Sequence, residues 1–199
     1  MFFAQRPSTG DIERFLAASR DLPLSYREVG MVSERPPGRR LDEQRVVIGQ
    51  GRDDFDRARA ALLSWKQFDI GWVETFPRNA RVEVGTVVTV LIRHLGFWSL
   101  NGARVVYLVG TNDNCRFGFA YGALTNHAEC GEELFEVFID PLNQHVIYRI
   151  LAMSWPQAAL TYIGQPIVRI LQARFRRDSA AAMTRSLQSQ VWQKCQGSA

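Results

Sequence analysis

Residues 115–140, CRFGFAYGALTNHAECGEELFEVFID, hold the pattern that decides the fold. Aromatic and aliphatic side chains recur through residues 115–124 and again through residues 132–140, with a polar connection between the two runs. Runs of this composition, bounded by turn residues, predict β-strands. Because no helical pattern separates them, we expect the two strands to pair antiparallel.

The same character extends outward on both sides, over residues 71–154. The other strand-like runs are residues 71–76, 81–85, 86–95, 103–111 and 145–154. They are punctuated by Gly85, the connection 95–102, Asn112–Asn114 and Asp140–Asn143. We therefore expect an antiparallel meander rather than alternating strands and helices.

The segment before the meander is predicted to contain a short helix and a surface loop. Ser8 or Thr9 can cap a helix in DIERFLAASR, and Asp11 stands favourably in its first turn. Residues 33–44 are rich in proline, glycine and charge, which predicts a loop.

A strand is predicted at residues 45–51, followed by a helix at residues 51–65 with Asp53 or Asp54 as its cap. Apolar residues recur along this helix at helical spacing. They are Phe55, Ala58, Leu62 and Trp65. This stripe is expected to face the core.

Helical character returns beyond Pro156, with a break at Gly164–Pro166 and a longer helix from near Pro166. Its expected inward face is formed by Ile163, Ile167, Ile170 and Leu171 and is continued by Ala181 and Leu187. We expect a single domain over residues 1–199, made of an N-terminal helix and loop (1–42), a strand, helix and meander (43–154) and a C-terminal helical segment (157–190).

The predicted fold class is α+β. A curved antiparallel sheet of about six or seven strands would wrap against the long C-terminal helix, with an extra helix at the N-terminus. If the sheet curves enough, a cavity remains between sheet and helix, where apolar ligands commonly bind.

Composition excludes several function classes. The 24 basic and 20 acidic residues give a net charge of +4, and the arginine clusters lack the interleaved aromatics of a single-strand nucleic-acid binder. The three cysteines include no CxxC pair, so we expect neither a metal site nor a disulfide scaffold. Without a P-loop or a GxGxxG motif, no nucleotide cofactor is expected.

No apolar run reaches the ~20 residues that span a bilayer. The N-terminal sequence also lacks the pattern of a signal peptide. We therefore expect a cytoplasmic protein, with no membrane span and no nucleic-acid partner. The sequence leaves the oligomeric state open.

The chain resembles a known family at residues 121–135, YGALTNHAECGEELF. The matching pieces elsewhere are YREVG (26–30), GWVE (71–74), Ser154–Pro156 and GQPIVRILQ (164–172). Together they resemble DUF1990 (UPF0548), a family of uncharacterised proteins. This chain departs from the usual pattern of that family at Ala123, Asn126, Ala128 and Trp155. The resemblance implies a helix-grip, START-like fold, but it implies no reaction.

Four titratable side chains lie within seven residues in this motif. They are His127, Glu129, Glu132 and Glu133. A histidine beside carboxylates can run general acid–base chemistry or ligate a metal, although the spacing matches no established metal frame. Two other interpretations remain open, namely a cluster that orients a ligand and a purely structural cap. Glu132 could then bond backbone donors or pair with Arg149.

Successive residues of the strand after Gly131 point to opposite faces of the sheet, so Glu132 and Glu133 lie on different faces. Glu133 shares one face with Phe135 and Val137, while Glu132 lies on the other. Burial of Glu133 would be costly without a partner, and the hydroxyl of Tyr121 also needs one if it is buried, which His127 or Glu133 could supply. Core aromatics that could line an apolar pocket include Trp72, Tyr107, Phe119 and Tyr121. Together with the polar residues Glu129, Glu132 and Arg149, they are the candidate ligand-binding residues.

Three functions are consistent with these patterns. The first is a binding module for a small hydrophobic or aromatic ligand, oriented by Tyr121, His127 and Glu133. The second is a lyase-, cyclase- or hydrolase-like enzyme in which His127 acts as acid–base with Glu133. The third is a structural or partner-binding domain without a cavity.

Overall fold

A computed structural model gives the fold of this chain, and it describes all residues except 36–37, 39, 157–164 and 197–199. The side chains of residues 156, 165–168 and 189–196 are likewise not described. The helices are α1 (Thr9–Ser19), α2 (Met31–Glu34), α3 (Gly51–Leu63), the single 3-10 turn η1 (Lys66–Phe68) and α5 (Gln165–Gln196). The strands are β1 (Phe2–Phe3), β2 (Asp42–Gln50), β3 (Val73–Phe76), β4 (Val87–His94), β5 (Phe97–Val109), β6 (Arg116–Ala123), β7 (Glu129–Ile139) and β8 (His145–Pro156).

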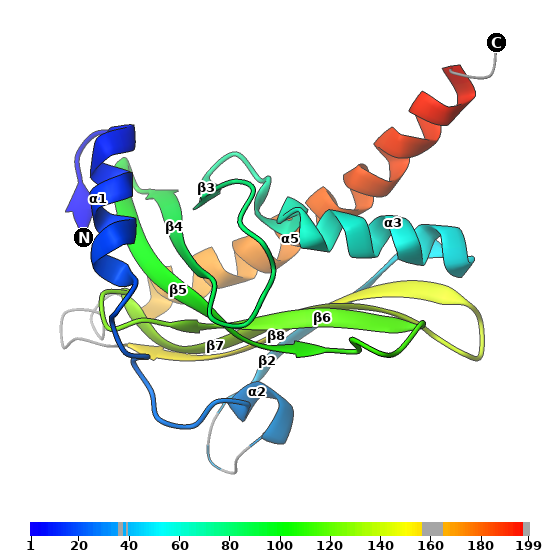
Figure 1. Ribbon diagram of the computed structural model, residues 1–199, viewed down its shortest axis with the longest axis horizontal. Coiled ribbons are helices and arrows are strands. Elements are labelled where there is room, and N and C mark those ends of the chain that lie inside the picture. The colour runs from blue at the N-terminus through cyan, green and yellow to red at the C-terminus, as the bar shows by residue number, and fades with distance from the viewer. Residues whose placement is uncertain (36–37, 39, 157–164, 197–199) are drawn as a thin grey trace.

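The strands form one antiparallel sheet in the order β2-β8-β7-β6-β5-β4-β3, and β1 pairs with β5. The sheet curls, and α3 and α5 lie on its concave side while α2 lies on the opposite, convex side (Figure 1). Every strand from β3 to β8 follows its predecessor in the sheet, as expected for a meander. The predicted α+β class, curved antiparallel sheet, long C-terminal helix and extra N-terminal helix are thus confirmed.

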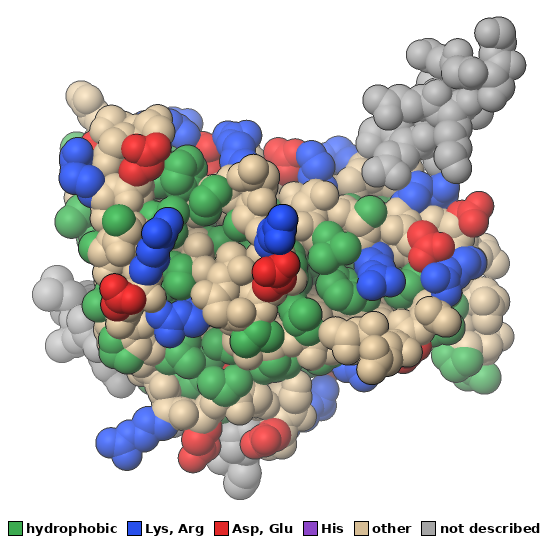
Figure 2. Space-filling view, viewed as in Figure 1, with side chains coloured by type: hydrophobic (Ala, Val, Ile, Leu, Met, Phe, Trp, Pro, Cys, Tyr) green, Lys and Arg blue, Asp and Glu red, His purple; other side chains and the backbone are tan. Residues whose placement is uncertain are grey.

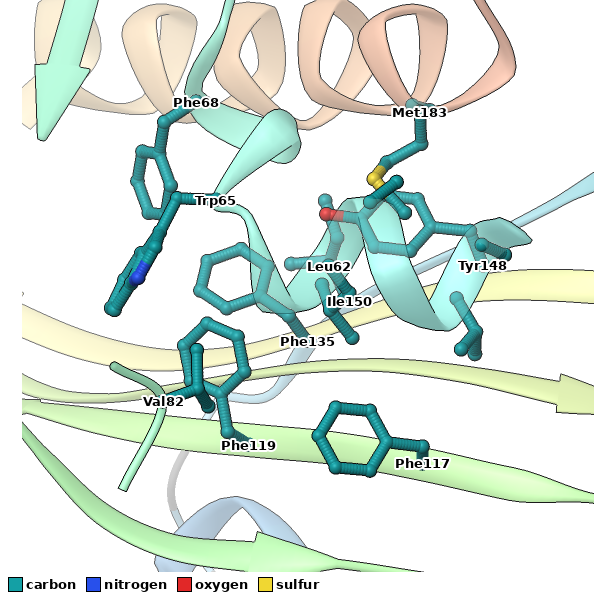
Figure 3. Packing of buried hydrophobic residues seen from close by; sticks show 14 of the residues in the cluster. Leu62, Trp65, Phe68, Val82, Phe117, Phe119, Phe135, Tyr148, Ile150 and Met183 are labelled. Atoms are coloured by element: carbon teal, nitrogen blue, oxygen red, sulfur yellow. The ribbon is translucent and has the colours of Figure 1, made fainter. Parts of the chain in front are cut away.

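The main core lies between the concave face of the sheet and the two helices α3 and α5. Phe119 and Phe135 from the sheet meet Trp65 and Phe68, which follow α3, while Met183 of α5 packs from the far side (Figure 3). The rings of Trp65 and Phe119 lie 4.9 Å apart, centroid to centroid. Each buried ring withdrawn from water stabilises the fold by about 2 kcal/mol.

The apolar stripe predicted for the helix at residues 51–65 is confirmed. All four of its residues are buried, namely Phe55, Ala58, Leu62 and Trp65. Neither candidate aspartate caps the helix through its own position, since the N-cap is Gln50. Asp54 instead reaches back, and its carboxylate accepts the Gln50 N–H at 2.7 Å. At the first helix, Ser8 is the N-cap and forms a reciprocal capping box with Asp11.

Two strand predictions were wrong. Residues 81–85 form no strand, and residues 97–102, predicted as a connection, are the start of β5. The chain reverses instead at Leu95–Gly96, where both residues have positive φ, 51° and 81°. This geometry suits a two-residue hairpin turn. Leucine is not a typical turn residue, so the sequence did not indicate a turn at this position.

The predicted loop at residues 33–44 contains the end of α2 and the start of β2. Cys115, which falls in the predicted strand 115–124, lies in an exposed turn. Cys130, which falls at the edge of the connection expected between the two predicted strands, is buried in β7. Ile170 and Ala181, expected to face inward, are exposed, Ile170 by 67%, whereas Leu187 is buried as expected. The predicted break before the last helix lies mostly outside the described residues.

On the face shown in Figure 2, charge is spread rather than concentrated. Arginine and lysine side chains alternate there with aspartate and glutamate side chains. Within the part of the chain that the structure describes, no helix is long and apolar enough to cross a membrane.

Candidate functional site

A cavity of about 220 Å³ lies between the concave face of the sheet and the first described turns of α5. Its walls are mostly apolar. Residues that define it include Phe68, Trp72, Tyr121, Glu133, Leu171 and Phe175. The predicted space between sheet and helix is therefore present.

Glu133 and Tyr121 form a hydrogen-bonded pair in the wall of this cavity. They are direct partners across β6 and β7, so both side chains stand on the concave face. The Tyr121 hydroxyl donates to Oε2 of Glu133 at 2.7 Å. This is the partnership that the burial of both groups requires, and it is one of the two partners predicted for Tyr121.

The environment of Glu133 moves its pKa toward neutrality. Burial raises the pKa to about 7, and the hydrogen bond from Tyr121 opposes that shift. The nearby Glu129 carboxylate raises the pKa further, while Arg176 of α5 lowers it. A carboxyl group in this state exchanges its proton near physiological pH.

His127 also borders the cavity, from the connection between β6 and β7. When Nδ1 of His127 carries no proton, it accepts from the backbone N–H of Glu129 at 3.0 Å. When Nδ1 is protonated, it donates to the Glu129 carbonyl at 3.1 Å. Burial lowers the pKa of His127 to about 4. The imidazole is therefore neutral at physiological pH, and it contacts the backbone rather than a carboxylate.

Glu129 joins the sheet to α5 at the edge of the cavity. Its two carboxylate oxygens accept from Nε2 of Gln172 at 3.1 and 3.2 Å, and the same amide donates to Ser154 at 2.8 Å. Burial raises the pKa of Glu129.

Gly131 allows strands β7 and β8 to approach each other closely beside Glu129. Its φ is +131°, and a Cβ at this position would stand 2.0 Å from the Met153 carbonyl oxygen.

Glu132 points away from the cavity, to the convex face. Its carboxylate accepts from the hydroxyls of Tyr26 and Tyr107 at 3.0 and 2.9 Å. It also accepts from the backbone N–H groups of Gly30 and Val32, at 2.9 and 3.4 Å. The predicted bonding to backbone donors is present, and it fastens the segment that includes α2 to the sheet.

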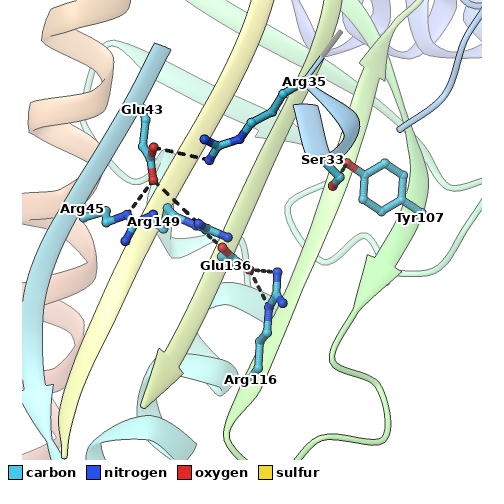
Figure 4. A network of polar contacts seen from close by, with 8 residues as sticks. All are labelled: Ser33, Arg35, Glu43, Arg45, Tyr107, Arg116, Glu136 and Arg149. Carbon is cyan, nitrogen blue, oxygen red and sulfur yellow. Dashed lines mark hydrogen bonds and ion pairs between the residues drawn. The ribbon is translucent and has the colours of Figure 1, made fainter. Parts of the chain in front are cut away.

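Three predicted ligand-binding residues lie outside the lining of the cavity. Tyr107 is on the convex face with Glu132, and Phe119 is fully buried in the core. Arg149 pairs with Glu136, its direct partner across β7 and β8, and with Glu43 at 3.6 Å (Figure 4). Arg149 therefore does not contact Glu132.

Trp72, by contrast, lines the cavity near its α5 side. Its indole N–H donates to Asp178 of α5 at 2.9 Å, and the Arg174 guanidinium lies 4.7 Å from its ring centroid. These contacts hold the ring in place.

Sequence reasoning did not single out the contribution of α5 to the site. Leu171 was expected to face inward, but Gln172, Phe175 and Arg176 were not named, although all line the cavity. The spacing of Leu171 and Phe175 by four residues was the available signal. Among the described residues, no group of three or more histidine, cysteine, aspartate or glutamate side chains could hold a metal ion.

Comparison with solved structures gives the same architecture at low sequence identity. The ZhuI aromatase/cyclase from Streptomyces sp. R1128 superposes with a TM-score of 0.51 at 14% identity, covering 76% of this chain and 95% of that one. A hypothetical protein from Helicobacter pylori gives 0.53 at 11%, covering 76% and 91%. The curled sheet gripped by its C-terminal helix defines a helix-grip, START-like protein.

Within that class, the chain belongs to the DUF1990 family, described as a domain of unknown function, which matches residues 25–182. A UPF0548 protein of Dictyostelium discoideum is 31% identical, covering 95% of this chain and 97% of the relative. A UPF0548 protein of Deinococcus radiodurans is 32% identical, covering 94% and 98%. The resemblance seen in the motifs is confirmed.

Proposed function

We propose that this protein binds a small hydrophobic or aromatic molecule in the cavity between the sheet and α5. The observation that carries the proposal is the cavity itself, about 220 Å³ of space with apolar walls and the Tyr121–Glu133 pair beside it. Well-packed interiors hold few voids larger than a water molecule. A cavity of about 150 Å³ admits benzene, so this one suits a molecule of one or two rings.

The polar groups supply orientation rather than most of the affinity. In small-molecule sites, a few placed polar groups fix the ligand while apolar walls bury it. Here the groups are Tyr121 and Glu133 in the sheet, with His127 and Glu129 nearby. Tyr107 and Arg149 take no part in this proposal, because their hydrogen bonds and ion pairs lie on the convex face.

The test is a native mass spectrum of the protein isolated without denaturation, compared with two variants. Ala152 is the direct partner of Glu133 across β7 and β8 and lines the cavity, so Ala152→Leu should fill it. Ala181→Leu makes the same change on an exposed position of α5. We expect a small-molecule adduct on the wild type and on Ala181→Leu that is absent from Ala152→Leu. An adduct that persists in Ala152→Leu contradicts binding in this cavity.

A second candidate, a small-molecule enzyme using the same cavity, is favoured by one observation. A carboxyl with a pKa of about 7 is matched to proton transfer near neutral pH. The acid–base role assigned to His127 from the sequence fits Glu133 better, because the low pKa of His127 makes the imidazole a weak base. Turnover in a metabolite screen that Glu133→Gln abolishes and His127→Asn retains would support this candidate. Turnover unaffected by Glu133→Gln would contradict it.

A further inference from the structure

The cavity has an acidic polar end. Glu133 and Glu129 both contribute to its lining, and only one permanently cationic side chain, Arg176, does so among the described residues. The Arg176 guanidinium lies 3.7 Å from Asp42, an acid of β2 that is not part of the lining. The charge of Arg176 is thus shared with a carboxylate outside the cavity.

The two glutamates differ in how their oxygens are used. Both oxygens of Glu129 accept from the Gln172 amide. In Glu133, Oε2 accepts from Tyr121, and Oε1 accepts no hydrogen bond from any residue that the structure describes. Glu133 lines the cavity, so this oxygen has acceptor capacity that a donor on a ligand can use.

Aromatic rings line the same cavity as Glu133. The Phe68 ring lies 6.0 Å from that of Tyr121, centroid to centroid, and 5.4 Å from that of Phe175. All three residues line the cavity. Because the faces of aromatic rings attract positive charge, a cavity lined by these rings suits a cation.

We propose that the ligand is a hydrophobic amine, whose protonated nitrogen donates to the free oxygen of Glu133 while its apolar body lies against Phe68, Leu171 and Phe175. This inference rests on the proposed function, since it assigns the polar end of the molecule in the same cavity. An ammonium group both donates the missing hydrogen bond and neutralises the carboxylate. A hydroxyl group would donate without compensating the charge, and a carboxylate ligand would add a third acid to the site.

The inference predicts a distinct pH dependence. The pKa of Glu133 is about 7, so its ionised fraction rises from about one tenth near pH 6 to about nine tenths near pH 8. The affinity for an amine that stays protonated over this range should rise about tenfold. Tyr121 and Tyr148 stay neutral here, because burial raises their pKa values, and His127 is already neutral. Arg176 keeps its charge, and Glu129, whose pKa is also raised, acts in the same direction as Glu133.

The experiment compares three probes with one aromatic body and different ends, naphthylethylamine, naphthylethanol and naphthylacetate, by calorimetric titration. Near pH 8 the wild type should bind the amine about tenfold more tightly than the alcohol, because charge-assisted hydrogen bonds are about twice as strong as neutral ones. Glu133→Gln keeps the shape and the Tyr121 hydrogen bond but removes the charge. It should abolish the preference for the amine and its pH dependence while leaving alcohol binding within about twofold. Glu43→Gln makes the same change at a carboxylate outside the lining of the cavity, paired with Arg45 and Arg149, so it is the matched control and should retain the preference.

The outcomes separate the two proposals. If the alcohol or the acetate binds as tightly as the amine, the amine inference is overturned while binding in the cavity stands. The same holds if Glu133→Gln keeps the preference for the amine. If none of the three probes binds the wild type, the proposed function and the amine inference fail together. Melting temperatures of the variants that are no lower than that of the wild type establish that a lost preference does not reflect unfolding.

Discussion

At Glu133, the environment that suits a candidate functional role lowers the stability of the fold when the carboxyl group is ionised. Burial in the wall of the cavity raises its pKa to about 7, so ionising it costs free energy that the folded state must supply. Groups with such shifts cluster at functional sites. A structural role alone is served better by a carboxylate with a full set of donors, as Glu132 has on the opposite face.

The raised pKa gives a signed prediction for stability. Because the folded-state pKa exceeds the ordinary value of 4.5, the proton on Glu133 stabilises the fold fully below about pH 4.5, and this contribution is lost as the pH rises through 7. Glu133→Gln should therefore exceed the wild type in free energy of unfolding by about 3 kcal/mol near pH 8, and by little near pH 4. Urea denaturation at both pH values measures this, and equal stability near pH 8 would contradict a buried, strained carboxylate.

His127 gives a second prediction at the same scale. Its pKa of about 4 means that the imidazole stays neutral through the range in which free histidine titrates. Nitrogen chemical shifts of the ring should show one neutral form down to about pH 5, with protonation near pH 4. Because the folded-state pKa is depressed, the contribution of His127 to stability is present above the ordinary pKa of 6.5 and is lost as the pH falls toward 4. A midpoint near 6.5 would mean that the ring is solvated and not buried beside the cavity.

At the scale of elements, strand β7 shows why sequence patterns succeeded. Strict alternation places Glu133, Phe135 and Val137 on the concave face, and the structure puts all three there. The register between β6 and β7 then sets Tyr121 opposite Glu133. The predicted partnership of these two residues needed only parity and the rule that buried polar groups are paired.

Elements held by tertiary contacts escaped prediction. The four-residue α2 has no side-chain cap, and the carboxylate of Glu132, about one hundred residues away along the chain, anchors its start. Likewise, Leu171 and Phe175 of α5 look like ordinary core residues in the sequence, and Gln172 and Arg176 look like ordinary surface residues, although all four line the cavity. Which charged partner Arg149 takes depends on strand register, and sequence alone does not give that register.

Removing the Glu132 carboxylate tests the anchoring of α2. Glu132→Ala should lower the free energy of unfolding by about 3 kcal/mol, because it leaves the hydroxyls of Tyr26 and Tyr107 and two backbone N–H groups without their acceptor. Amide hydrogen exchange at Gly30 should accelerate as the segment detaches.

The matched control is Glu43→Gln, which removes a partly exposed carboxylate from the arginine network of Figure 4. Surface pairs of this kind contribute about 0 to 1 kcal/mol, so this variant should stay close to the wild type. If Glu132→Ala and Glu43→Gln were equally mild, the Glu132 cluster would not be what holds α2.

At the scale of the whole molecule, the sheet has two faces with different tasks. The convex face carries fully bonded carboxylates, Glu132 with its four donors and Glu136 between Arg116 and Arg149. The concave face carries the apolar core and, toward α5, a cavity with an incompletely bonded carboxylate. This division explains how one motif, Gly131–Glu133, supplies both an anchor for the fold and a candidate ligand contact.

The most direct test of the central claim is where a small aromatic molecule binds. Naphthylethanol has few heavy atoms, so a dissociation constant of about 100 µM is expected. Intermolecular nuclear Overhauser effects from its ring protons should reach methyl groups that line the cavity, Val90, Ile92 and Leu171. None should reach Leu151 and Met153 on the convex side of β8. Contacts to Leu151 and Met153 instead, or binding that Ala152→Leu leaves unchanged, would contradict a ligand held between the sheet and α5.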